Sequence, residues 1–523
     1  MSHNISDVLL SQASEFVASQ VGLHFPKGRW PDLERGILSA VQEFGFKDAE
    51  SCIQWLLSSL LTKKQIEVLA SHLTVGETYF FRDKNSFEIL ESRILPELTR
   101  SSRTDERRLR VWSAGCATGE EPYSIAILIS RVISDLKDWN ITILATDINP
   151  TFLRKASEGV YSEWSFRDTP PWIKERYFKK REDGRFEILP HFKEMVTFSC
   201  LNLAEDTYPS LLNNTLVMDI IFCRNVLMYF APQKVKGVIQ NLYRCLVDDG
   251  WLIVSPSELS HVLFSQFAAV NFPGTILYKK DSKDSKGPQT AQAFPYEFNN
   301  EVKVSFQPPL EVAAQSGSGF TLAEESRGVP PLEIKDQKVE EPEQALYAEA
   351  LALYEQGRYA EATENLLQLL SHDPDDSKAI SLLARACANR GKLTEALEWC
   401  QKAIAAHRLS AELYYLHGTI LQEQGAIDDA TISLKRVLYL DQDFVLAHVA
   451  LGNLALRQGK VKESEKHFEN ALSVLSAYRQ EEVLPESEGM TAGRLREIIS
   501  TTVQRNPSYG AKATGTDAVR RLE

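Results

Sequence analysis

The stretch VWSAGCATGEEPYS, from Val111 to Ser124, decides the fold of the first half of this chain. Leu109 to Trp112 is a short apolar run with strand character. Gly115 and Gly119 then let the backbone turn sharply, and Glu120 to Pro122 are typical of the first turn of a helix. In α/β domains, a strand, a glycine turn and a helix start bring a main chain without Cβ atoms close to a nucleotide-like ligand.

The two carboxylates of this turn indicate which ligand it suits. A phosphate-binding loop normally offers a lysine or a third glycine, whereas this turn offers Glu120 and Glu121. We therefore expect a ligand that is cationic or neutral at this end. S-adenosylmethionine, with its ammonium and sulfonium groups, suits the turn better than NAD or ATP. The alternative from this stretch alone is an ordinary strand-to-helix turn of an α/β domain.

The length and charge of the chain narrow the class of protein. Its 523 residues are too many for one core, so we expect several domains. The net charge of -13 argues against nucleic acid as the partner, because phosphate binding needs clustered Lys and Arg. The one notable basic cluster, Arg100 to Arg110, is as easily a solvated connector.

Cysteine usage and the lack of long apolar runs indicate the compartment. The seven cysteines include no CxxC pair, which indicates neither a zinc site nor a disulfide framework. The N-terminus lacks a basic segment followed by an apolar one, and no run of about 18 apolar residues occurs. We therefore expect a cytoplasmic protein with no metal and no direct membrane insertion.

The segments around the glycine turn predict a helical region and then a sheet. Apolar residues recur at three- and four-residue steps over residues 5 to 72, as in a small all-helical domain. The segment TVGETYFFR, Thr74 to Arg82, follows, and a helix is predicted from Lys84 to Leu98. A second helix is predicted from Ile125 to Ile133. Further strands are predicted at Ile141 to Ala145, Met195 to Cys200, Asp219 to Phe222, Trp251 to Ser255 and Thr275 to Lys279.

Polar residues and one glycine follow four of these strands. In a doubly wound sheet the carboxyl ends of the strands face one crevice, so Gly115, Asp147, Asn202 and Arg224-Asn225 are expected to converge there. Asp147 is placed to accept hydrogen bonds from two ribose hydroxyls. An N-cap of the helix that follows is the alternative for this aspartate. Between the second and third strands, Asp183-Gly184 predicts a small antiparallel hairpin.

The last third of the chain is repetitive. Gly357, Gly391, Gly425 and Gly459 recur at a spacing of 34 residues, and a small residue follows each of them five positions later. This period predicts four tetratricopeptide repeats, stacked with a concave face for a partner's peptide or helix. The preceding residues 281 to 342, rich in Pro, Ser, Gln and charges, are predicted to be a disordered linker.

Four motifs, taken in order, resemble one family. TVGETYFFRD, RVWSAGCATGEEPYSIAI, ATDIN and DIIFCRNVLMYF are similar to the motifs of the CheR-type chemotaxis receptor methyltransferases. The resemblance covers about residues 5 to 280 and is specific, because FFRD and CRNVLMYF are not general features of methyltransferases. It implies an α/β Rossmann-like methyltransferase domain preceded by a small all-α domain; the repeats add an all-α tetratricopeptide-repeat domain. It also implies methyl transfer from S-adenosyl-L-methionine to glutamate carboxylates of methyl-accepting chemoreceptors.

These expectations divide the chain into five parts. They are a helical domain at residues 1–85, a methyltransferase domain at 86–280 with an antiparallel subdomain at 178–200, a linker at 281–342, four repeats at 343–478, and a capping helix with a disordered tail at 479–523. The expected partners are the cytoplasmic domain of a chemoreceptor and a protein that binds the repeats.

The resemblance also assigns roles to single residues. Arg82 is expected to orient the substrate carboxylate and Tyr229 to donate its hydroxyl, and a packed core tyrosine is the alternative for Tyr229. A glutamate carboxylate, with a pKa of about 4.3, is already ionised at neutral pH and needs no general base. The residues expected to bind the cofactor are Thr78, Arg82, Glu121 or its neighbour Glu120, Asp147, Asn202, Leu203, Arg224 and Asn225.

Two departures from the family pattern leave questions open. Gly76 stands where relatives often have an asparagine, so one cofactor contact is either missing or supplied by Glu77. The hairpin at Asp183-Gly184 is too short for the loop of relatives that dock on a receptor's C-terminal pentapeptide. The repeats are therefore expected to supply partner contact through the linker. A methyltransferase acting on another substrate and a repeat-based scaffold with little catalysis remain as alternatives.

Overall fold

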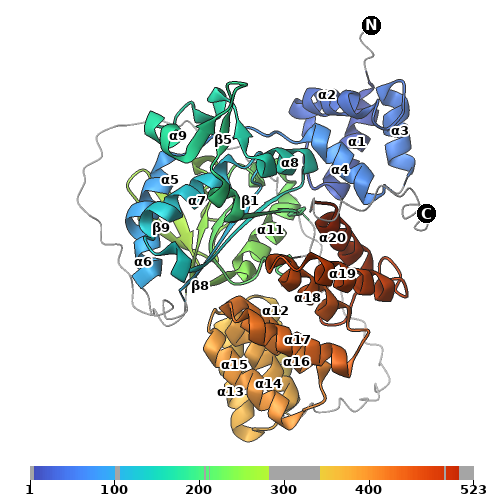
Figure 1. The fold of residues 1–523 in the computed structure, drawn as a ribbon. Coiled ribbons are helices and arrows are strands. Elements are labelled where there is room, and N and C mark those ends of the chain that lie inside the picture. Colours follow the sequence, from blue (N-terminus) through green and yellow to red (C-terminus); the bar gives the residue numbers. More distant parts are fainter. Residues whose placement is uncertain are drawn as a thin grey trace, which may run out of the picture.

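The computed structural model describes residues 5–59, 61–100, 107–204, 208–210, 213–281, 342–487 and 490–505. Three regions follow one another along the chain: N-terminal helices, a central α/β region and a C-terminal array of helices (Figure 1). This is the fold class predicted from the sequence, which is thereby confirmed. Nearly all of the predicted linker, and the tail beyond Arg505, lie outside the described residues.

The N-terminal helices begin at capping side chains and pack their apolar faces together. Ser6 caps α1, Asp48 caps α3, and Thr62 closes a capping box at the start of α4. Leu33 and Ile53 are fully buried in the core that these helices share. The helices are α1 (Asp7–Gln20), α2 (Trp30–Ala40), α3 (Ala49–Ser58) and α4 (Lys63–Leu73).

A seven-stranded sheet in the order β6-β2-β1-β7-β8-β10-β9 forms the centre of the molecule. The first five strands of this order are parallel to one another, and β10 runs antiparallel to β8 and to β9. The carboxyl ends of the parallel strands therefore meet at one edge. The strands are β1 (Arg108–Ala114), β2 (Asn140–Asp147), β6 (Val196–Cys200), β7 (Met218–Phe222), β8 (Leu246–Ile253), β9 (Ala268–Phe272) and β10 (Thr275–Lys279).

Alternate residues of the strands face two different cores. Val111 packs with apolar residues of α7, whereas its neighbour Trp112 packs with apolar residues of α11 on the other face. The sheet is therefore covered on both sides, as a doubly wound fold requires. The helices of this region are α5 (Lys84–Ile89), α6 (Leu95–Arg100), α7 (Glu120–Val132), α8 (Pro150–Glu158), α9 (Pro171–Tyr177), α10 (Pro190–Glu194) and α11 (Pro232–Cys245).

A second, three-stranded sheet contains the predicted hairpin. Its order is β3-β5-β4, formed by β3 (Val160–Tyr161), β4 (Phe178–Lys180) and β5 (Phe186–Ile188). Gly184 has a φ of 80°, and the Arg181 amide donates to the Arg185 carbonyl across 2.8 Å, which closes a tight turn. The hairpin prediction is confirmed. The sequence prediction missed β3 and β9, because a two-residue strand and the AAVNF stretch carry little strand signal.

The C-terminal region consists of four helix pairs and one final helix (Figure 1). The repeated glycines, from Gly357 to Gly459, each have a φ between 71° and 81° at the turn between the two helices of a pair. The helices are α12 (Pro342–Glu355), α13 (Tyr359–His372), α14 (Ser377–Asn389), α15 (Leu393–Ala406), α16 (Ala411–Gln424), α17 (Ile427–Leu440), α18 (Val445–Arg457), α19 (Val461–Leu475) and α20 (Ala492–Arg505).

The repeats contact the α/β region at the edge opposite the strand carboxyl ends. A Cβ on Gly391 would lie 3.2 Å from Val247 at the start of β8, and one on Gly425 would lie 3.1 Å from Asn140 at the start of β2. Arg390 donates to Asp248 across 2.8 Å. The repeat turns therefore pack on the amino-terminal edge of the sheet.

This contact corrects one interpretation of the sequence and bears on a second. Arg110, taken as part of a solvated connector, is buried in β1 and forms an ion pair with Glu423 of the third repeat. The repeats were expected to be joined to the catalytic region by a flexible linker, with folding back onto it as the alternative, and they pack directly on it. A spacing of 34 residues places the four turns in one row, yet it carries no information about the surface that the row contacts.

Among the described residues, no helix combines the length and apolar character needed to span a bilayer.

Candidate functional site

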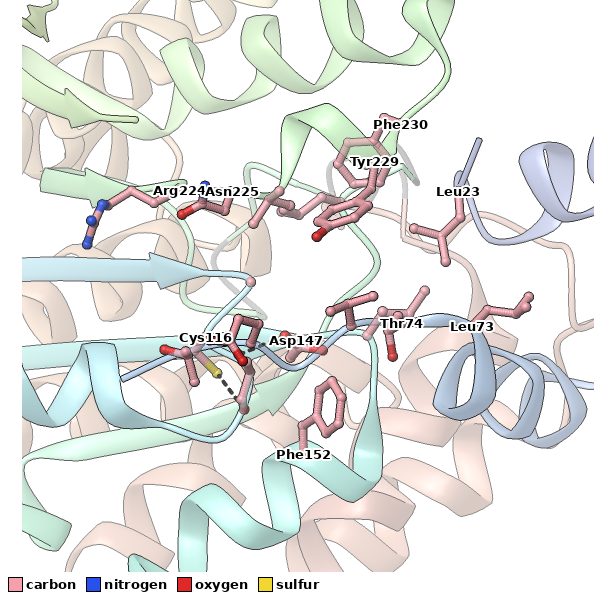
Figure 2. A pocket seen from close by; sticks show the side chains of 18 of the residues that line it. Leu23, Leu73, Thr74, Cys116, Asp147, Phe152, Arg224, Asn225, Tyr229 and Phe230 are labelled. Carbon is pink, nitrogen blue, oxygen red and sulfur yellow. Dashed lines mark hydrogen bonds between the residues drawn. The ribbon is translucent and has the colours of Figure 1, made fainter. Parts of the chain in front are cut away.

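A cavity of about 1080 Å³, measured with its open mouth, lies at the carboxyl edge of the sheet (Figure 2). The strand ends form one wall, and the N-terminal helical region with the segment after it forms another. Nine of the ten site residues expected from the sequence line this cavity. They are Thr78, Arg82, Glu121, Asp147, Asn202, Leu203, Arg224, Asn225 and Tyr229.

The glycine turn after β1 brings Glu121 to the cavity and turns Glu120 away. Glu121 accepts hydrogen bonds from Ser113 at 2.7 Å and from Arg224 at 3.2 Å. Burial raises the pKa of Glu121, and the charge of Arg224 opposes that rise. Glu120 is buried against Ser165, to which it is hydrogen-bonded at 2.9 Å, and it does not line the cavity. Of the two candidate glutamates, only Glu121 is available to a ligand there.

Gly115 makes the close packing of this turn possible. Its φ is 81°, a backbone conformation that residues other than glycine rarely adopt. A Cβ at this position would also lie only 2.4 Å from Val226 Cγ2, in the loop after β7. The two loops can therefore form adjacent walls of one cavity.

Asp147 ends β2 with its carboxylate held by the main chain. Its two oxygens accept hydrogen bonds from the amides of Ala117 and Asn149, each at 2.9 Å. Burial raises its pKa to about 6, and these amides oppose the rise. The N-cap of α8 is Asn149, whose side chain accepts from Thr151 and Phe152, so the capping alternative for Asp147 is wrong.

Arg224 connects the motifs around the cavity. Its guanidinium donates to the Arg82 carbonyl at 2.7 Å and lies 3.5 Å from the carboxylate of Asp83, besides pairing with Glu121. Its side chain is only 2% exposed. Figure 2 shows it directed along the sheet, away from Tyr229. Arg224 therefore connects the loop after β7 to the turn after β1 and to the FFRD segment through hydrogen bonds and ion pairs.

Arg82 lies between two residues in strained backbone conformations. Phe81 has a φ of 54° and Asp83 a φ of 60°. The Arg82 guanidinium donates to the Glu77 carbonyl at 2.8 Å. Within the part of the chain that the structure describes, no carboxylate lies at ion-pair distance from it. Its remaining N–H groups are therefore available to an anion in the cavity.

The neighbourhood of Gly76 explains the departure from the family pattern. A Cβ on Gly76 would lie 2.6 Å from the ring of Phe152, which lines the cavity. Glu77 also lines the cavity, but its carboxylate forms an ion pair with Arg167. A side chain at position 76 would therefore collide with the Phe152 ring.

Tyr229 lies where the N-terminal helical region meets the loop after β7. Its carbonyl accepts a hydrogen bond from the His24 amide at 2.7 Å, and the Arg29 guanidinium lies 5.4 Å from its ring centre. The residue is half-buried, and its hydroxyl points into the cavity between the two walls (Figure 2). The hydroxyl is therefore accessible to a ligand, although one side of the ring packs against the core of the N-terminal helices.

Glu258, which the sequence interpretation did not single out, organises this loop. Its two carboxylate oxygens accept from the amides of Asn225 at 2.7 Å, Val226 at 2.8 Å and Met228 at 3.3 Å. Asn225 has a φ of 56°, so the loop needs such support. The signal that could have found Glu258 is the capping-box pattern that it forms with Ser255.

Comparisons with known proteins found relatives of two parts of the chain. The model of the "CheR methyltransferase, SAM binding domain" family matches residues 76–272, and tetratricopeptide-repeat models match 347–411 and 411–444. A chemotaxis protein methyltransferase of Borreliella burgdorferi is 32% identical over 257 residues, 49% of this chain and 89% of its own. Chemotaxis protein methyltransferase 1 of Pseudomonas aeruginosa is 34% identical over 41% of this chain and 77% of its own. A solved structure of MamA is 22% identical, covers 26% of this chain and 79% of its own, and has a TM-score of 0.25.

Proposed function

Because this chain belongs to the CheR family of chemotaxis protein methyltransferases, we propose that it methylates glutamate side chains of methyl-accepting chemoreceptors. The observation that carries this proposal is the presence of Arg82 and Tyr229 in the same cavity as Glu121 and Asp147. The two carboxylates suit the cofactor, whereas the other two side chains are available to a substrate carboxylate.

The donors and acceptors of the cavity fit S-adenosylmethionine. The buried carboxylate of Glu121 suits an ammonium group, and that of Asp147 can accept from ribose hydroxyls. Asn202 and Leu203, just after the end of β6, offer an amide and an apolar surface to a base. These residues would hold the cofactor, which supplies a methyl group activated by a sulfonium.

The chain's own residues have to position a nucleophile rather than activate it. A glutamate carboxylate is ionised at neutral pH, so a base to deprotonate it is not needed. Its oxygen forms a bond to the methyl carbon while the carbon–sulfur bond breaks, which leaves a neutral thioether and a glutamate methyl ester. The rate then depends on holding the carboxylate in line, about 3 to 3.5 Å from the methyl carbon.

Arg82 and Tyr229 are our candidates for that positioning. Arg82 can donate charge-assisted hydrogen bonds to one carboxylate oxygen, and Tyr229 can donate its hydroxyl. The hydrogen bond from its guanidinium to the Glu77 carbonyl holds the Arg82 side chain before a substrate enters. Tyr229 is held by backbone and ring contacts to the N-terminal helical region, which would therefore form part of the substrate entrance.

The proposed macromolecular substrate is the cytoplasmic domain of a chemoreceptor, so we place the reaction in the cytoplasm. The tight turn at Gly184 leaves the antiparallel subdomain without a long loop, and we propose that receptor recognition does not use a C-terminal pentapeptide.

A methyl-transfer assay tests the proposal. Purified protein is incubated with tritiated S-adenosylmethionine and receptor cytoplasmic fragments, and the label is scored for release by base, which cleaves glutamate methyl esters. A receptor fragment with its acceptor glutamates changed to alanine is the control. Base-labile label on the first fragment alone supports the proposal. Cofactor binding without label on any receptor fragment would contradict the glutamate assignment.

A further inference from the structure

Residues 479–491, which we call the C-terminal segment, join the last repeat to α20 and bury apolar side chains without forming a helix. Residues 488 and 489 lie outside the described residues. Leu484 is 3% exposed and Met490 is 1% exposed. The Leu484 amide donates to the Met490 carbonyl at 2.9 Å, and the hydroxyl of Ser487 lies within hydrogen-bond distance of the carbonyls of both Leu484 and Met490. The segment is therefore a compact loop seated on an apolar surface.

That surface is formed by the first helices of the repeats. Successive first helices α12, α14 and α16 contact one another, and we call the surface lined by α12, α14, α16 and α18 the first-helix face. Leu484 and Met490 share an apolar cluster with Tyr415 of α16 and Val449 of α18. Glu486 forms an ion pair with Arg385 of α14. The segment therefore reaches back from the fourth repeat to the second.

The repeat period shows which part of the face is covered. Tyr347 and Tyr415 occupy equivalent positions two repeats apart, yet Tyr347 is half-buried whereas Tyr415 is 5% exposed. Leu351 and Thr419 are likewise equivalent, and they are 36% and 6% exposed. Part of the burial of Tyr415 comes from the ring of Phe444, where Asp376 stands at the equivalent position beside the first repeat. Leu484 and Met490 belong to the apolar cluster of α16 and α18, whereas residues of α12 belong to another cluster, so the segment covers the third and fourth repeats and leaves the first open.

We propose that the first-helix face binds an acidic, leucine-containing peptide of a partner protein, and that the C-terminal segment occupies this site until the partner displaces it. The chemistry of the site follows from its present occupant, in which Leu484 fills an apolar position and Glu486 pairs with Arg385. The sequence EEVLPE around these residues has the same acidic and apolar character. This inference does not depend on methyl transfer.

The geometry allows the exchange to take place without unfolding the end of the repeats. Helix α20 packs on α19, and Arg496 donates to the carbonyls of Leu475 and Tyr478, so both ends of the segment are anchored. The loop can leave the face while these anchors stay. The exposed Leu351 and the half-buried Tyr347 give a partner a place to bind first.

Peptide binding to the full-length chain tests the proposal. The probe is a fluorescein-labelled peptide of sequence RQEEVLPESEGMT, and its binding is followed by anisotropy. In the wild type the tethered segment competes with the probe. We expect Leu484→Asp or Glu486→Arg in the protein to tighten probe binding by about tenfold or more, because the competitor is removed. Glu481→Arg, at an exposed position of the same segment, is the matched control and should leave probe binding as in the wild type.

Charge reversal then identifies the site. Adding Arg385→Glu to the Leu484→Asp protein should abolish binding of the probe, and a probe with arginine in place of Glu486 should restore it. Circular dichroism shows whether each variant is folded, and Glu486→Arg carries the test if Leu484→Asp is not. Equal probe binding by the wild type and the segment variants, or binding that ignores Arg385, would overturn the proposal.

Discussion

The guanidinium of Arg110 lies 2.6 Å from the carboxylate of Glu423, and this ion pair joins the first strand of the sheet to the third repeat. The two side chains are 6% and 9% exposed. Burial lowers the pKa of Arg110 from its ordinary value, and the charge of Glu423 opposes that change. A buried charge without a partner is costly, so each side chain requires the other while the interface is closed.

Replacing Glu423 by alanine should therefore destabilise the protein. We expect the free energy of unfolding to fall by about 3 kcal/mol or more, because Arg110 would be left buried without its carboxylate. Chemical denaturation of Glu423→Ala measures the loss, and Glu412→Ala, at an exposed position of the same helix, is the control. Equal stability of the two variants would show that the interface does not hold the repeats.

Glu258→Gln should loosen the loop that carries Asn225 and Tyr229. A glutamine keeps one acceptor oxygen and turns an NH₂ group toward amides that themselves donate, so we expect a loss of about 1–3 kcal/mol. Denaturation and cofactor titration should both be affected, since the loop lines the cavity. Glu88→Gln, at an exposed position, is the control. Unchanged cofactor affinity in a destabilised Glu258→Gln protein would restrict Glu258 to a structural role.

The strand ends were predictable because they follow from short-range patterns. An apolar run that ends in a glycine or a polar residue marks the carboxyl end of a strand, and parallel strands share one edge, so Asp147 and Asn202 could be placed together from the sequence alone. The 34-residue glycine period is equally local. Each of these predictions uses residues that are close in sequence or related by the topology.

The contacts that were missed join residues far apart in the chain. Arg110 and Glu423 are separated by 313 positions, and no local pattern marks a charged strand residue as buried. Glu120 and Glu121 are adjacent and chemically alike, so only the direction of the first turn of α7 decides which one faces the cavity. Side-chain direction at a helix start and the docking of one domain on another depend on tertiary packing, which periodicity does not report.

The raised pKa of Asp147 predicts opposite pH dependences for cofactor binding and for stability. Hydroxyl donors need the ionised carboxylate, so cofactor affinity should fall as the pH drops through about 6. The pKa of Asp147 in the folded state lies above its ordinary value of 3.8, so protonation of this carboxylate stabilises the unliganded fold. This stabilisation is complete when the pH is below 3.8. The contribution is then lost as the pH rises through about 6.

Titrations of the wild type and of Asp147→Asn between pH 5 and 8 separate these effects. The variant should bind the cofactor more weakly at neutral pH, by about 1–3 kcal/mol, because the ribose hydroxyls lose a charged acceptor. The residual cofactor affinity of the variant should not change as the pH passes through about 6. An equal change in the affinity of Asp147→Asn would assign the titration to another group, for which Glu121, whose pKa burial also raises, is the candidate.

Tyr229→Phe should separate catalysis from cofactor binding. The hydroxyl points into the cavity, while Arg29 lies over the ring and the His24 amide holds the main-chain carbonyl, so removing the hydroxyl leaves the packing in place. We expect turnover to fall by roughly 10- to 100-fold, because one hydrogen bond to the reacting carboxylate is lost, with little change in cofactor affinity.

Arg82→Ala is the contrasting variant and should lower both turnover and cofactor affinity, because Arg82 lines the cavity next to the Glu121 and Arg224 pair. Single-turnover methylation with saturating receptor fragment measures the first effect, and calorimetry with S-adenosylmethionine measures the second. If the phenylalanine variant turned over like the wild type, Tyr229 would have no part in the reaction, and positioning of the carboxylate would rest on Arg82.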